Sequence, residues 1–154
     1  MTDKHQKFMK EAIKQAKKAG EKSEIPIGAV IVRGEKIIAR GYNRRICDKN
    51  PTAHAEIEAL KKAGKKEGAW NLSGCDMYVT LEPCIMCYGA ALNSRIDNIY
   101  FGAYDSKFGI GDLKNSGAIN FNHTLNLQGG ILENECSKIL TDFFSQLRKN
   151  KNQK

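Results

Sequence analysis

The sequence predicts an α/β fold in which helices flank a mixed β-sheet, and three observations indicate it. Segments with apolar residues at three- and four-residue spacing alternate with short runs rich in valine and isoleucine, an order typical of helices packed on a sheet. Two of the β-branched runs are neighbours, which predicts at least one antiparallel strand pair. At 154 residues the chain is expected to form a single domain, 1–154, that ends in a basic tail at 148–154.

The first elements are a helix and a β-hairpin. Residues 3–19 carry apolar side chains at helical spacing, and Gly20 follows as a stop signal. The stretch IPIGAVIVRGEKIIARGYN, residues 25–43, holds two β-branched runs on either side of Gly34. Such runs separated by a short turn predict a hairpin.

A second helix is expected within NPTAHAEIEALKKAG, residues 50–64. Thr52 suits a helix N-cap and Gly64 suits the residue that ends the helix. His54 and Glu56 should therefore lie in its first turn.

The second half of the chain continues the alternation. Pro83 suits the first position of a helix, because proline lacks the N–H that is unpaired there. The expected order is a strand at 75–80, a helix at 84–94, a strand at 97–103, an irregular glycine-rich segment at 103–123, a weak strand at 124–129 and an amphipathic helix at 132–149.

Four residues near the two central helix starts indicate a metal site. Cys84 and Cys87 are three apart, so their sulfurs can point from one helix face, and zinc is the ion that such a pair prefers. His54 supplies a third ligand if the two helix starts abut. Three protein ligands leave a fourth position for water, which is the pattern of catalytic zinc. Glu56, two residues from His54, can then approach that water as a proton carrier.

Other interpretations of the cysteines stay open at this point. Cys84 and Cys87 can be two buried thiols or a redox pair, although a redox pair does not need the neighbouring His-x-Glu. Cys75 can supply a fourth ligand and close a structural zinc site in a non-catalytic nucleic-acid-binding module. Five cysteines without regular spacing predict thiols in a reducing compartment.

Composition and charge limit the function classes. The formal net charge is +8, with 27% charged residues, which favours an anionic partner such as a nucleic acid. No apolar run approaches the roughly 20 residues that cross a bilayer, and residues 1–10 lack the apolar core of a secretory signal. We therefore expect a cytoplasmic protein without a membrane partner.

His54-Ala55-Glu56 followed by Pro83-Cys84-Ile85-Met86-Cys87 is the H-x-E and P-C-x-x-C signature of zinc nucleobase deaminases. Beyond this motif the chain resembles the bacterial tRNA-specific adenosine deaminases of the cytidine/deoxycytidylate deaminase superfamily. The resembling stretches are IPIGAVIV, GYNRR, DKNPTAHAEIEAL, AWNLSGCDMYVTLEPCIMCYGAALNSRI, YFGAYDSK, FNH and DFFSQLRKNK.

The resemblance implies a fold, a reaction and a partner. The expected fold is three-layered and cytidine-deaminase-like, with a mixed five-stranded sheet flanked by helices, and the expected assembly is a homodimer. The expected reaction is hydrolytic deamination of the wobble adenosine of a tRNA anticodon loop to inosine. One Zn²⁺ per subunit would be held by His54, Cys84 and Cys87, and Glu56 would carry protons.

The resemblance also implies substrate contacts. Asn43 would hydrogen-bond the purine, Ala55 would donate a backbone N–H, and Pro26 would form a pocket wall. The remaining contacts to the tRNA loop would come from Asp105, Lys107, Asn122, His123 and Phe144. The residues alone, without the resemblance, favour Asn43 as a turn residue, Asp105 as a loop cap and Phe144 as a core residue.

One segment departs from the family pattern. After YDSK the chain reads FGIGDLKNSG, about two residues shorter than the family's serine-containing glycine loop. This segment lies near the substrate in relatives, so a deaminase of a free base or nucleoside, such as guanine or cytosine, remains the alternative function.

Overall fold

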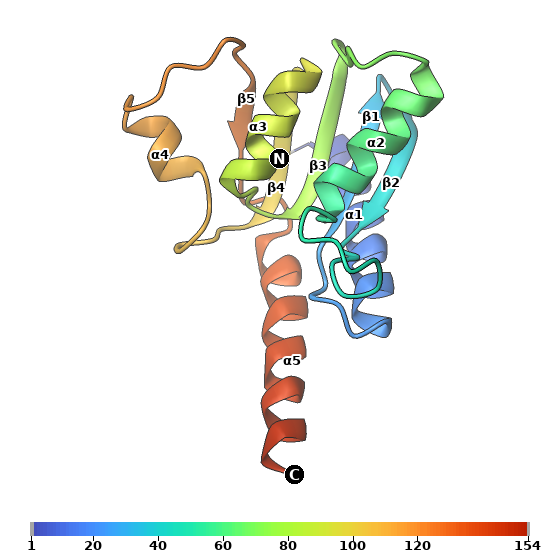
Figure 1. The fold of residues 1–154 in the computed structure, drawn as a ribbon, viewed down its shortest axis with the longest axis vertical. Helices are drawn as coiled ribbons and strands as arrows, with labels where there is room; N and C mark the ends of the chain where they lie inside the picture. The colour runs from blue at the N-terminus through green and yellow to red at the C-terminus, as the bar shows by residue number, and fades with distance from the viewer. Residues whose placement is uncertain (1, 154) are drawn as a thin grey trace.

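The structure, a computed structural model that describes residues 2–153, contains a five-stranded mixed sheet between helices (Figure 1). The strands are β1 (Gly28–Arg33), β2 (Lys36–Tyr42), β3 (Cys75–Leu81), β4 (Asn98–Ala103) and β5 (Asn126–Gln128), and their order is β2-β1-β3-β4-β5. β1 is antiparallel to β2 and β3, whereas β3, β4 and β5 are parallel. The predicted hairpin and mixed sheet are confirmed, with Gly34 at φ 62° in the turn.

Helices cover both faces of this sheet. α1 (Asp3–Glu21) and α5 (Glu133–Asn152) share one core cluster with the sheet, and α2 (Ala55–Glu67) and α3 (Ile85–Ser94) belong to the other. The predicted three layers are therefore confirmed. The last turns of α5 extend beyond the sheet (Figure 1). Within residues 2–153, none of the helices is both long and apolar enough to cross a membrane.

The predicted starts of the two central helices were wrong by one or two residues. The Asn50 carboxamide oxygen accepts hydrogen bonds from the backbone and the hydroxyl of Thr52, so Thr52 stabilises a turn and His54 is the N-cap residue of α2. This helix also continues past Gly64 to Glu67, and Gly68, with a left-handed φ of 68°, is its C-cap residue. Cys84, rather than Pro83, precedes α3 as its N-cap residue. His54 and Cys84 therefore occupy equivalent places on neighbouring helices.

The segment predicted to be irregular contains the short helix α4 (Gly111–Asn115). It is followed by a loop that leads to β5, and both lie at the β5 side of the sheet (Figure 1). The final helix begins one residue later and ends three residues later than predicted.

Candidate metal centre and active site

The N-terminal ends of α2 and α3 bring three metal-binding side chains together. His54 Nδ1 lies 3.8 Å from Cys84 Sγ and 3.5 Å from Cys87 Sγ. All three ligand atoms lie within 4.8 Å of one another, and within the described residues this is the one such group of histidine, cysteine or carboxylate side chains. Cys75 lies buried at the start of β3 and is not part of the group.

The geometry fits a tetrahedral zinc ion. Zn–S bonds of about 2.3 Å and Zn–N bonds of about 2.1 Å place a nitrogen and a sulfur about 3.6 Å apart when the angle is tetrahedral. The two observed nitrogen–sulfur distances lie on either side of this value. Three protein ligands leave one coordination position for water or substrate, as in catalytic zinc sites.

The ionisation of the cysteines also suits a cation. The Cys87 thiol donates to Cys84 and lowers the pKa of Cys84 to about 3. The same hydrogen bond, together with burial, raises the pKa of Cys87. One thiolate is therefore favoured without metal, and a divalent cation favours deprotonation of the second.

Glu56 lies in the first turn of α2 beside this cluster. Its side chain is 4% exposed, and burial raises the pKa of its carboxyl group. Its carboxyl group forms hydrogen bonds with the backbone N–H of Glu56 itself and with the Cys87 thiol, so it faces the cluster directly. A buried carboxyl group next to a metal centre is suited to proton transfer.

A cavity of about 590 Å³ opens over the cluster. Its wall includes His54, Glu56 and Cys84, together with residues from four other parts of the chain. Sequence reasoning did not identify most of these residues, because apolar and aromatic side chains in a pocket have the same pattern as core residues. The lining residues that were missed are Ile25, Ile27, Arg45, Leu81, Glu82, Tyr104, Ser106, Phe108 and Leu140.

Two of the expected base contacts lie in a small recess beside this cavity. Asn43 and Ala55 line it with His54. The Asn43 amide donates to the carbonyl of Ile25, and its oxygen accepts from the N–H of Arg45, so Asn43 acts as a turn residue in this structure. Ala55 is the first residue of α2, where N–H groups lack intrahelical acceptors. Pro26 is buried next to Gly20, and the adjacent Ile25 and Ile27 form the wall.

The other expected contacts divide into two groups. Asp105, Lys107 and Phe144 line the cavity. Asp105 also caps its own loop, because its carboxylate accepts from the N–H groups of Lys107 and Phe108. Phe144 is 38% exposed and is not a core residue.

Asn122 and His123 do not line the cavity. Asn122 is exposed, and His123 Nε2 lies 3.0 Å from the carbonyl oxygen of Ile96. Sequence reasoning had no means of placing this pair, because the glycine-rich segment before it determines its position.

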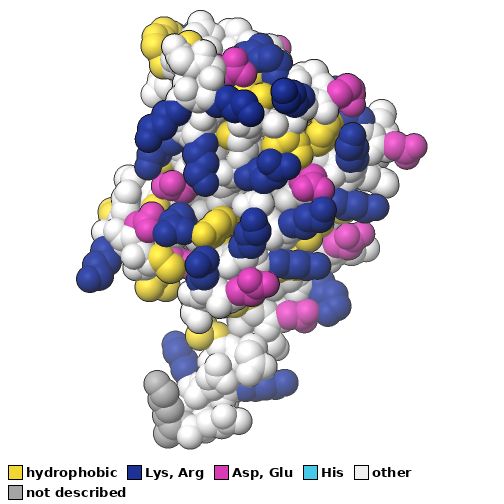
Figure 2. Space-filling model, turned by 90° about the vertical axis from the view of Figure 1, so that its right-hand side faces the viewer, with side chains coloured by type: hydrophobic (Ala, Val, Ile, Leu, Met, Phe, Trp, Pro, Cys, Tyr) yellow, Lys and Arg dark blue, Asp and Glu magenta, His cyan; other side chains and the backbone are white. Residues whose placement is uncertain are grey.

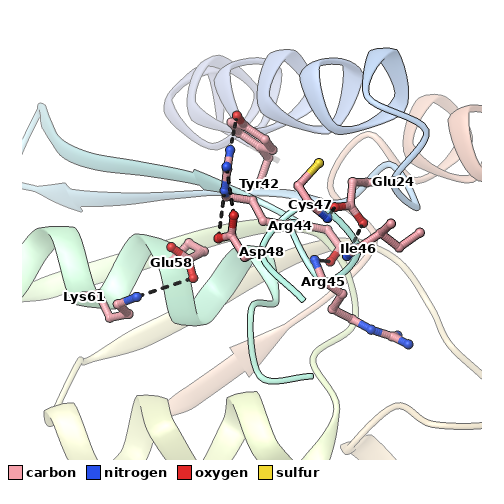
Figure 3. A network of polar contacts seen from close by, with 10 residues as sticks. Glu24, Tyr42, Arg44, Arg45, Ile46, Cys47, Asp48, Glu58 and Lys61 are labelled. Carbon is pink, nitrogen blue, oxygen red and sulfur yellow. Dashed lines mark hydrogen bonds and ion pairs between the residues drawn. The ribbon is translucent and has the colours of Figure 1, made fainter. Parts of the chain in front are cut away.

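The loop that carries Arg45 is held by charged side chains (Figure 3). The carboxylate of Glu24 faces this loop and accepts from the N–H groups of Ile46 and Cys47, at 3.0 and 2.8 Å. The Arg44 guanidinium forms a two-point contact with Asp48, at 3.0 and 2.9 Å. Both contacts fix residues 44–48, and the N–H of Arg44 donates to the carbonyl of Ala53, the residue before His54.

The fold, the cluster and the cavity define a class of protein. The zinc-binding region of the cytidine and deoxycytidylate deaminases matches residues 2–103, so the chain belongs to the cytidine and deoxycytidylate deaminase family. This finding confirms the predicted zinc-dependent deaminase and its cytidine-deaminase-like fold.

Two relatives with high sequence identity share the name tRNA-specific adenosine deaminase. The chain is 49% identical to the tRNA-specific adenosine deaminase of Bacillus subtilis over 146 residues, which is 94% of this chain and 91% of the relative. It is 42% identical to the enzyme of the same name from Aquifex aeolicus over 93% of this chain and 95% of the relative.

Solved structures show the same relationship. A tRNA:A34 deaminase, which carries out A-to-I editing at the wobble position of transfer RNA, superimposes with a TM-score of 0.82 at 40% identity. The match covers 86% of this chain and 98% of that one. A guanine deaminase from Bacillus subtilis has a TM-score of 0.65 at 32% identity, over 82% of this chain and 83% of that one.

Proposed function

We propose that this protein deaminates the wobble adenosine of a tRNA anticodon loop to inosine, releasing ammonia. The observation that carries the proposal is the 49% identity to a tRNA-specific adenosine deaminase over 94% of the chain. The side chains that the reaction needs lie together in the cavity, which supports the same conclusion.

Each residue at the centre has a chemical role in this proposal. His54, Cys84 and Cys87 would hold the metal ion, and zinc bound there would lower the pKa of water and so supply a nucleophile at neutral pH. Glu56 would accept a proton from the attacking water and deliver it to N1 of the purine as the oxygen adds to C6. Glu56 would then carry the remaining hydroxyl proton from that oxygen to N6, the C6–N6 bond would break, and N6 would leave as ammonia.

The wall of the cavity is suited to an extruded base with its neighbours. Tyr104, Phe108 and Phe144 are exposed aromatic side chains on which bases can stack. Arg45 and Lys107 supply positive charge for phosphates. Anticodon bases are already unpaired, so moving one into the cavity costs little free energy. We place the enzyme in the cytoplasm on the basis of this substrate.

The proposed active form is a homodimer. An open groove of about 820 Å³ on the outer surface of α2 and α3 is lined by apolar residues such as Ile57, Leu60 and Ala90. Trp70 borders it and is 68% exposed. A second copy of this chain would cover the exposed tryptophan through a two-fold contact. Sedimentation of the Trp70→Ser variant would show a monomer if the groove forms the interface, and an unchanged mass would exclude it.

The reaction is tested by mass analysis of an adenosine-34 tRNA incubated with the purified zinc-loaded protein. Inosine at the wobble position, absent with Glu56→Gln, is the expected result. Parallel incubations with free guanine, cytosine and adenosine separate the alternative. Ammonia release from a free base, without any change in the tRNA, would overturn the proposal.

A further inference from the structure

The net positive charge of this protein is confined to its first 67 residues. Residues 1–67 contain 17 of the 25 basic residues and 9 of the 17 acidic ones, which leaves an excess of eight. Residues 68–154 contain eight of each and have no net charge, although they include the basic tail. Lysine and arginine side chains dominate the face that α1, β2 and α2 present (Figure 2).

On α1 the lysines form a stripe. Lys7, Lys10, Lys14, Lys17 and Lys18 are exposed, and at 100° per residue they fall within about 100° of helix surface. The apolar side chains of α1 lie on the opposite side, against the sheet. The stripe therefore presents a positive charge about every 5 Å along about 16 Å of helix.

Acidic neighbours neutralise little of this stripe. Lys14 pairs with Glu11 at 2.7 Å. Within the described residues, Lys10, Lys17 and Lys18 have no such partner. Their charges remain available to an anionic ligand.

The stripe leads towards the active-site cavity. α1 ends at Glu21, and Ile25, four residues further on, already lines the cavity. We infer that the lysine stripe of α1 is a second RNA-binding surface, which contacts tRNA phosphates outside the anticodon loop. This inference rests on the proposed function. The aromatic ring beside the stripe, Phe8 under Lys7, is buried, so a regular array of lysines without an exposed ring for stacking fits a phosphate backbone better than unpaired bases.

Two double variants test this surface. Lys10→Gln with Lys17→Gln removes two charges from the stripe, and Lys62→Gln with Lys66→Gln removes two exposed lysines from α2 as the matched control. The dissociation constant for full-length tRNA should rise about tenfold in the α1 variant. In the α1 variant the slope of the logarithm of this dissociation constant against the logarithm of the salt concentration should fall by about two.

Binding of an isolated anticodon stem-loop should change less than twofold in the α1 variant. Inosine formation by the wild-type protein in both full-length tRNA and the stem-loop tests the proposed reaction separately from the lysine stripe of α1. Equal losses in the α1 and α2 variants would show an effect of net charge alone, and equal losses with tRNA and stem-loop would place the contact at the loop. Either result overturns the inference.

A second inference concerns Glu82, a carboxylate that is 8% exposed beneath the cavity. Its two oxygens accept from the N–H groups of Asp105 and Gly111, at 3.0 and 2.8 Å. It forms no ion pair within the described residues. A Cβ added at Gly109 would lie 2.3 Å from the Glu82 carboxyl carbon. The loop 105–111 is therefore wrapped closely around this side chain.

We propose that Glu82 is a positioning residue for this loop, which brings Asp105, Lys107 and Phe108 to the cavity. In Glu82→Gln one oxygen becomes an N–H donor that faces a backbone N–H, so one buried hydrogen bond is lost. Amide exchange at Asp105 and Gly111 should accelerate about tenfold, and KM for tRNA should rise by a similar factor. kcat and zinc content should stay unchanged.

Glu135→Gln, at an exposed position of α5, is the matched control and should change neither the amide exchange of the loop nor KM for tRNA. Loss of zinc from Glu82→Gln would show that the residue supports the metal centre instead. An unchanged KM with faster loop exchange would show that the loop does not position the substrate. Both outcomes contradict the proposal.

Discussion

Gly41 determines how closely α2 can approach β2, and therefore where Glu56 lies. A Cβ at this position would be 2.5 Å from the carbonyl oxygen of Ala55 and 2.6 Å from the N–H nitrogen of Ala59. Ordinary contact begins at 3.4 Å, so Gly41→Ala must displace the start of α2 by about 0.9 Å. Both atoms belong to the helix backbone, so the clash cannot be relieved by rotation of a side chain.

The displacement should affect stability and catalysis together. Overpacking of this kind costs about 1–3 kcal/mol of unfolding free energy, and a shift of about 1 Å at a catalytic group can reduce the rate about 100-fold. Urea unfolding and single-turnover inosine formation measure the two effects. Gly89→Ala is the control, because its Cβ would meet no atom within 4 Å inside α3 and should stabilise the protein by about 0.5–1 kcal/mol. Wild-type stability and rate in Gly41→Ala would refute this reasoning.

Three further predictions follow from the site. Glu56→Gln should bind one zinc per chain while inosine formation falls at least about 10²-fold, as measured by metal analysis and a deamination assay; zinc loss would assign Glu56 a structural role. Phe144→Ala should raise KM for tRNA about tenfold through loss of base stacking. Leu147→Ala, at a similarly exposed position of α5, should leave KM unchanged. Equal KM values for the two variants would show that Phe144 does not contact the substrate. Burial alone raises the pKa of Glu24, but the N–H donors of Cys47 and Ile46 outweigh burial and lower the pKa below 4.5. The ionised Glu24 carboxylate therefore stabilises the folded protein fully above pH 4.5, and this stabilisation is lost as pH falls through the lower folded-state pKa. Glu24→Gln should therefore show a shallower loss of Tm towards acid pH, and parallel curves would contradict this assignment.

The sequence was sufficient to predict the elements that a local pattern specifies. The hairpin at Gly34, the amphipathic first helix and the group of His54, Cys84 and Cys87 follow from periodicity, turn residues and ligand spacing. The five-stranded sheet and the three layers came from family resemblance, and the order of the strands was not predicted, because local patterns leave strand order open.

Features that depend on contacts between distant segments could not be predicted. Asn50 binds Thr52 and moves the start of α2 to His54, which a list of good N-cap residues does not reveal. Glu24 and Glu82 have no sequence signal, because their partners are backbone N–H groups that the tertiary fold brings to them. The positions of Asn122 and His123 depend on the conformation of a glycine-rich loop.

The central claim is that an imidazole and two thiolates hold zinc with one coordination position left for water. Zinc-edge X-ray absorption of the purified protein tests it most directly. The account predicts one nitrogen and two sulfur ligands, with a single oxygen as the fourth. Three sulfur ligands, or a fourth protein side chain in place of that oxygen, would contradict it.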